Sequence, residues 1–169
     1  VITSQYESLL GEEPIVIDED GKALSHVALQ GSEEGYSIVT VNSDNELRLT
    51  QFTVEESLFD DEQNFESESY KIETLKYKVK FLLMDNEQRM LYVVDASGGI
   101  NFYNIADKED MRFIERVDVT KSKSKITDIQ LASGGISLLV AESTGRVSQW
   151  FPVRDDNNHY KLSYVREFS

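Results

Sequence analysis

The chain has 169 residues, which is enough for one domain with a core of its own. With 40% hydrophobic and 28% charged residues it has the composition of an ordinary globular protein, which excludes collagen, complete disorder and a membrane-embedded chain. Asp and Glu number 31 against 17 Lys and Arg, and the formal charge of −14 argues against binding to nucleic acid or anionic lipid. The absence of cysteine excludes disulfides, zinc fingers and Cys nucleophiles.

Residues 1–23 are predicted to form a leading strand or linker, with one strand over residues 14–17. No window reaches the roughly 20 apolar residues that a membrane helix needs. Residues 18–21 (DEDG) resemble the opening of a calcium loop, but the later ligands do not follow, so a plain turn is the preferred interpretation. Because the chain starts without Met and ends abruptly, we expect it to be a piece of a longer protein.

Three later segments resemble one another, at residues 41–50, 94–103 and 141–150. Each joins an apolar run, one polar residue, a tight turn and an alternating strand. The turns contain residue types that tolerate the positive φ of a short hairpin. The turn pairs are Asp44-Asn45, Ser97-Gly98 and Thr144-Gly145.

Matching apolar runs upstream of these segments keep the same offsets, so each unit holds three strands. A fourth strand is predicted at residues 70–77, 111–119 and 160–168, which gives repeat units over about 24–77, 78–124 and 125–169. Four antiparallel strands that recur every 40 to 50 residues or so are typical of a β-propeller blade. The predicted fold is therefore all-β and propeller-like, a partial or open propeller of about three blades within a single unit, residues 1–169. A β-sandwich or barrel is the alternative.

The third unit carries the most specific local pattern. Residues 144–150 (TGRVSQW) resemble the Asp-Gly-x-Val-x-x-Trp of WD-repeat blades, although the Gly-His pair of that family is missing and Phe151 replaces its final Asp. The equivalent position of the Trp holds Tyr103 and Thr50 in the other units. The resemblance implies a degenerate WD-like propeller, in which we expect Trp150 to pack between blades. The alternative is a binding anchor beside Phe151 and Arg154.

An acidic stretch, EESLFDDEQNFESES at residues 55–69, falls between the third and fourth strands of the first unit. It is interpreted as a solvated insertion. The functional alternative is a docking loop for a basic partner. The predicted partner-binding residues are Phe59, Asp60, Asp61, Glu62 and Phe65.

Two other features bear on partners. Alternation at residues 76–80 (KYKVK) predicts a strand with its lysines on one solvent face, where they protect an edge, or, as a sharper alternative, contact phosphate. An open arc of blades also leaves strand edges exposed, which predicts partners, including a second copy of the chain.

No motif predicts catalysis. His26 and His159 have no metal-ligand spacing to another residue, and neither a phosphate-binding loop nor a nucleophile elbow is present. The sequence therefore predicts a protein that is not an enzyme, with no catalytic, cofactor-binding or metal-binding residue and no cofactor.

The C-terminal unit also carries a family resemblance. LASGGISLLV (131–140), GRVSQWFPVR (145–154) and YKLSYVREF (160–168) resemble the large extracytoplasmic insert of Gram-negative phosphate-type ABC transporter permeases. The resemblance implies an accessory domain on the periplasmic side of the inner membrane. Its partners would be the membrane domain of the parent permease and a periplasmic phosphate-binding protein.

Under this leading hypothesis the domain assists or regulates phosphate uptake through protein contacts. Direct binding of phosphate is not expected, because a charge of −14 repels an anion. The alternative is a WD-like protein-interaction scaffold of a soluble cytosolic or nuclear assembly.

Overall fold

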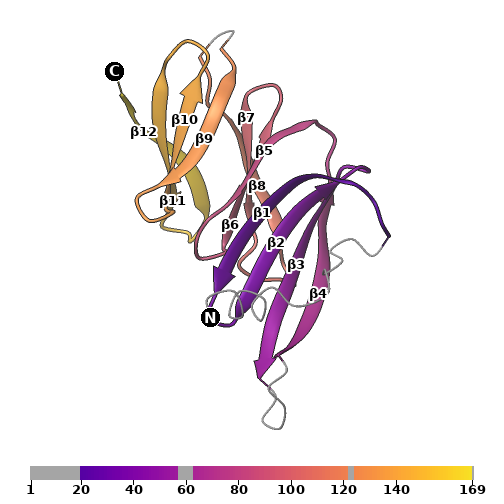
Figure 1. Cartoon of the computed structure of the whole chain (residues 1–169). Helices are drawn as coiled ribbons and strands as arrows, with labels where there is room; N and C mark the ends of the chain where they lie inside the picture. The colour runs from indigo at the N-terminus through magenta and orange to yellow at the C-terminus, as the bar shows by residue number, and fades with distance from the viewer. Residues whose placement is uncertain (1–19, 57–62, 122–123, 169) are drawn as a thin grey trace, which may run out of the picture.

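The computed structural model describes residues 20–56, 63–121 and 124–168. Twelve strands form three four-stranded antiparallel sheets, and no helix occurs in these three ranges. Each sheet is a meander in chain order, and the three sheets lie side by side as a fan (Figure 1). The prediction of three four-stranded antiparallel blades is confirmed, and the arc that they form is not closed into a ring.

We name the sheets blades A, B and C. Blade A contains β1 (Leu24–Ser32), β2 (Gly35–Asn42), β3 (Glu46–Glu56) and β4 (Gln63–Thr74). Blade B contains β5 (Val79–Met84), β6 (Met90–Asp95), β7 (Gly99–Asn104) and β8 (Arg112–Asp118). Blade C contains β9 (Ile126–Ala132), β10 (Ser137–Glu142), β11 (Val147–Arg154) and β12 (Tyr160–Phe168).

The repeated polar residue before each hairpin is buried and belongs to the turn. Asn42, Asp95 and Glu142 are each 3% exposed. In blade A the Asn42 Oδ1 accepts the backbone N–H groups of Asp44 and Glu46, both at 3.0 Å. The second residue of each turn pair has the positive φ that the sequence predicts. These residues are Asn45, Gly98 and Gly145. One polar side chain thus satisfies turn amides that no strand neighbour reaches.

Blade B lies at the centre of the hydrophobic core, with both of its faces covered. All six residues of β6 are buried, and the five apolar ones alternate between two clusters. Leu91 and Val93 pack with residues of blade A, whereas Tyr92 and Val94 pack with residues of blade C. This run of consecutive apolar residues is what a strand buried on both faces requires.

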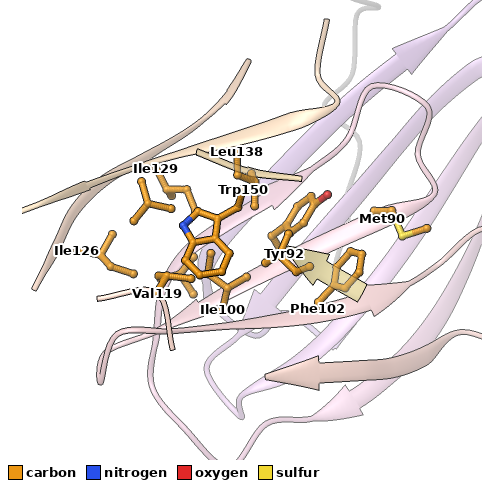
Figure 2. Packing of buried hydrophobic residues seen from close by; sticks show 12 residues of the cluster. Met90, Tyr92, Ile100, Phe102, Val119, Ile126, Ile129, Leu138 and Trp150 are labelled. Carbon is orange, nitrogen blue, oxygen red and sulfur yellow. The ribbon is translucent and has the colours of Figure 1, made fainter. Parts of the chain in front are cut away.

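Trp150 belongs to the cluster between blades B and C, which confirms the prediction that it packs between blades. Its indole N–H donates to Ser148 Oγ at 2.9 Å, and its ring meets Tyr164 edge-on at 5.6 Å. Figure 2 shows the ring among Ile100, Val119 and Leu138.

Two local predictions were wrong. The acidic stretch is strand rather than insertion where it is described, because β3 continues to Glu56 and β4 begins at Gln63. The pairing of β3 with β4 continues in register through these residues, so they lengthen the hairpin and do not interrupt the blade. Residues 76–78 are not a strand but the crossing from blade A to blade B. There the lysines are exposed, and Lys80 Nζ donates across to the Ile126 carbonyl.

Candidate functional site

The predicted docking residues fall mostly outside the described part of the chain. Phe59, Asp60, Asp61 and Glu62 lie outside it, and Phe65 lies in β4, opposite Val54 of β3. Their role in binding a partner stays a prediction. Two other kinds of surface stand out in the described residues, namely the free faces at the ends of the arc and a groove between blades B and C.

The three blades use equivalent positions to pack on one another. The face that each blade turns toward the following blade is its downstream face, and the opposite one is its upstream face. Val39 of blade A and Tyr92 of blade B are equivalent downstream positions, offset by 53 residues, and both are buried against the next blade. Leu91 of blade B and Leu138 of blade C are equivalent upstream positions, also buried.

The upstream face of blade A has no blade against it among the described residues. Its apolar side chains come from three strands that pair directly, with Leu29 opposite Ile38 and Tyr36 opposite Phe52. Leu29 is 56% exposed, although its equivalent in blade B, Leu82, packs against the core. We define this face by Val27, Leu29, Tyr36 and Ile38, together with Phe52, which is only 6% exposed.

The downstream face of blade C is free in the same sense. Phe151 and Val153 alternate with inward-facing residues of β11, and Phe168 lies opposite Val147 at the end of the ladder. Phe151, Val153 and Phe168 are each more than a third exposed, whereas Val147 is half-buried. We define this face by Leu139, Val147, Phe151, Val153 and Phe168.

A Ser-Gln contact occurs on both downstream faces, but only its serine stands at equivalent positions. On the downstream face of blade A, Gln51 Nε2 donates to Ser37 Oγ at 3.4 Å, and Ser37 Oγ donates to Gln88 Oε1 of blade B at 2.5 Å. On the free face of blade C, Gln149 Nε2 donates to Ser137 Oγ at 3.2 Å. Ser137 stands at the position equivalent to Ser37, but the equivalent of Gln51 is Phe151, and Gln149 lies opposite Leu139.

A groove of about 640 Å³ lies at the outer end of blades B and C. Glu115, which lines the groove, accepts the Leu162 N–H of blade C at 2.7 Å and so links the two blades. Phe113 is half-exposed in it, and His159 stands at its edge on the β11–β12 turn. The groove carries carboxylates, bases and an aromatic ring, which suits a polypeptide better than one small apolar ligand.

The strongest ionic cluster has a structural role. Arg116 Nε donates to Asp95 Oδ2 at 2.8 Å, and Asn101 Nδ2 donates to the same oxygen at 3.0 Å. Burial opposes ionisation of Asp95, but the hydrogen bonds from Arg116, Ser97, Asn101 and the Gly99 amide outweigh it. They hold the pKa of Asp95 well below its usual range. The cluster ties β8 to the β6–β7 turn.

The two histidines lie in different blades that do not adjoin. His26 is in β1 of blade A, with Nδ1 3.0 Å from Ser25 Oγ, and His159 is exposed on blade C. In the described ranges no three His, Asp or Glu side chains are arranged to hold a metal ion. Those ranges also contain no helix that could cross a membrane.

Sequence reasoning missed the free faces, although a signal for them existed. Alternation in residues 35–42 and 147–154 shows that each strand has two apolar faces, as β6 does. An alignment of the three units position by position would have shown that the end blades carry apolar residues with no blade to cover them.

Comparison with solved structures shows the fold. Kluyveromyces lactis Hsv2 matches with a TM-score of 0.62 and 11% identity, over 92% of this chain and 51% of that one. The β-propeller domain of Myceliophteria thermophila Cps50 (Swd1) matches with a TM-score of 0.51 and 11% identity, over 78% and 43% of the two chains. A putative 6-phosphogluconolactonase from Bacteroides fragilis has a TM-score of 0.51 and 15% identity, over 94% and 45%.

No family model matches the sequence, and no curated protein matches it either. The chain spans about half the length of the propeller structures that it matches. At these identities the comparisons establish architecture and not activity. The chain has the fold of an arc of three β-propeller blades.

Proposed function

We propose that this chain is a non-catalytic protein-interaction module that joins other β-sheet blades through the two free faces of its arc. The observation that carries the proposal is the equivalence of those faces to the packed ones. On blade C, Leu139 and Val147 occupy the positions that Tyr92 and Ile100 of blade B use to pack against blade C. A face with the same arrangement as a packed face is expected to bind another blade in the same way.

The apolar content of the two faces supports this proposal. Val27, Leu29 and Tyr36 are about half exposed on blade A, and Phe151 and Val153 are more than a third exposed on blade C. Contiguous exposed apolar side chains on a sheet face are typical of interaction sites. The free face of blade A is an upstream face and that of blade C is a downstream face, so the free face of one copy matches the opposite free face of another.

Self-association tests the proposal with the chain alone. We expect sedimentation velocity to show an assembly that grows with concentration, because two copies can bury each other's free faces. Leu29→Asp places a charge in the face of blade A and should weaken the association by about tenfold or more. Phe113→Asp is the matched control, since Phe113 is about as exposed but lies outside both faces.

A wild-type chain that stays monomeric at every concentration would contradict joining through these faces. An equal loss of association in the Leu29→Asp and Phe113→Asp variants would also contradict it, since the effect would then follow from added charge at any exposed apolar site.

The sequence resemblance at residues 131–140, 145–154 and 160–168 supports a second, more specific function. In this second candidate function the module belongs to the periplasmic side of a phosphate-type ABC permease and contacts its membrane domain and a phosphate-binding protein. Titration calorimetry with the phosphate-binding protein of the same organism, with and without phosphate, is expected to show binding. A triple variant with Asp60, Asp61 and Glu62 changed to Asn, Asn and Gln tests the predicted acidic loop. No heat at high concentration in either condition would remove this docking role.

A further inference from the structure

A second cavity lies between blades B and C, distinct from the outer groove. It encloses about 240 Å³ between the β5–β6 turn of blade B and the β9–β10 turn of blade C. Asn86 closes one side of it, because its Nδ2 donates to the Gly134 carbonyl at 2.7 Å. We call it the inter-blade pocket. Its volume is below that of most sites for drug-sized ligands and suits a single side chain.

Tyr92 lines this pocket, and its buried hydroxyl has no hydrogen-bond partner among the described residues. Tyr92 is fully buried, its ring stacks on Phe102 with centroids 5.2 Å apart, and no described group makes a hydrogen bond with its hydroxyl. Figure 2 shows that hydroxyl directed away from Trp150, toward the Met90 end of the cluster, and Met90 also lines the pocket. A buried hydroxyl without a partner is costly, so it points to a group that completes it from outside.

The charges around the pocket favour a cation. Asp85 is half-buried, and its Oδ1 accepts the N–H groups of Arg89 and Met90, both at 2.8 Å. Glu87 is paired with Arg89 at 3.2 Å. Lys108 also lies within the field of Asp85, but its Nζ donates to the Ile105 carbonyl at 2.8 Å instead. The second oxygen of Asp85 therefore accepts no hydrogen bond from the described residues.

The remaining walls are apolar and match an aliphatic stem. Met90, Pro152 and Tyr160 line the pocket beside the polar groups. Burial, together with the charge of Asp85, raises the pKa of Tyr92, so its hydroxyl stays neutral and keeps its lone pairs available to a donor. Lysine and arginine bury an apolar stem and present a charged head, which is the combination that this pocket accepts.

We propose that the inter-blade pocket binds the guanidinium of an arginine side chain from a protein partner, with Tyr92 Oη and Asp85 as its acceptors. Arginine fits better than lysine because its planar fork donates to two acceptors at once. A chain of charge −14 also concentrates basic segments at its surface. This proposal depends on the interaction role proposed above in one respect, which is that the arginine belongs to a protein partner.

The test uses a small probe, so that it does not depend on association through the free faces. Nα-acetyl-arginine amide is titrated into the ¹⁵N-labelled chain and followed by amide chemical shifts. We expect shifts confined to the two turns, at amides such as those of Glu87 and Gly135. The neutral isostere Nα-acetyl-citrulline amide should bind about tenfold more weakly or worse.

Tyr92→Phe separates a binding role from a structural one. Since the hydroxyl has no partner among the described residues, the variant should keep the wild-type melting temperature or exceed it, and it should lose about tenfold in affinity for the arginine probe. Asp85→Asn keeps Oδ1 for the turn and should lose affinity as well. Tyr36→Phe, which removes a hydroxyl elsewhere, should change neither quantity.

Three results would overturn the proposal. They are the absence of localised shifts up to the solubility limit of the probe, equal binding of the arginine and citrulline probes, and unchanged affinity in Tyr92→Phe. A melting temperature lowered by Tyr92→Phe would also overturn it, because the hydroxyl would then serve the fold. If the probe binds as expected while the free faces show no association, the pocket stands and the proposed joining of blades fails.

Discussion

Arg116 Nε lies 2.8 Å from Asp95 Oδ2, and this pair connects the outer strand of blade B to the hairpin turn at the other side of β7. Asp95 is almost fully buried, whereas about a third of the Arg116 side chain is exposed. The carboxylate is thus the member that depends on its partner, since it would be left buried and unpaired without the guanidinium.

Removal of Arg116 is therefore expected to destabilise the fold. Arg116→Ala should lower the free energy of unfolding by about 2 kcal/mol, because the buried carboxylate loses charged hydrogen bonds. Arg112→Ala, which removes the exposed pair of Arg112 with Asp110, should change it by less than about 0.5 kcal/mol. Urea denaturation measures both values, and equal effects would contradict the structural role of the Asp95 cluster.

Acid should weaken the fold through the same carboxylate. The folded-state pKa of Asp95 is depressed, so its contribution to stability is present above the unfolded pKa of about 4 and is lost as the pH falls below it. Asp95→Asn should lower the stability at neutral pH and flatten its decline in acid. Thermal melts between neutral and acid pH check this, and an equally steep decline in the variant would assign it to other carboxylates.

Gly99 leaves room for the Arg116 guanidinium. A Cβ at position 99 would come within 2.3 Å of its Cζ, so Gly99→Ala should push Arg116 off Asp95 and cost about as much as Arg116→Ala. In the Arg116→Ala background the added cost should be much smaller. A double-mutant cycle by urea denaturation measures the coupling, and strict additivity would contradict it.

Trp150 should dominate the packing between blades B and C. Trp150→Ala is expected to cost about 3 to 5 kcal/mol, because it removes a buried ring from the larger cluster. Ile136→Ala serves as the exposed control, since Ile136 is half-exposed on a turn, and should cost less than about 1 kcal/mol. A small effect of Trp150→Ala in calorimetric melts would mean that the blades pack more loosely than described.

Much of the fold could be predicted because its cause is local. The polar residue before each turn, together with Asn45, Gly98 and Gly145, predicted the hairpins, and strand alternation predicted the sheets. The segment around residues 76–80 was misread because a crossing between blades can share the alternation of a strand. What keeps Val79 inside is contact with residues distant in sequence, which local pattern does not encode.

The candidate surfaces were harder to predict. The free face around Leu29 looks like any buried strand in the sequence, because its exposure depends on whether a neighbouring blade exists. The unpartnered Tyr92 hydroxyl has no sequence signature either, since only the packing of blade C against blade B shows which polar groups it leaves without a partner.

The most direct test of the central claim uses the absence of native cysteine. Leu29→Cys labels the free face of blade A, and Phe151→Cys labels that of blade C. One variant is produced with heavy isotopes, so that the mixed dimer and the two like dimers differ in mass. The two variants are then mixed under mild oxidation, and the disulfide-linked dimers are separated by mass. Complementary faces predict that the mixed dimer forms well above its statistical share. A statistical distribution of the three dimers, or no disulfide at all, would contradict the account of two matching blade faces.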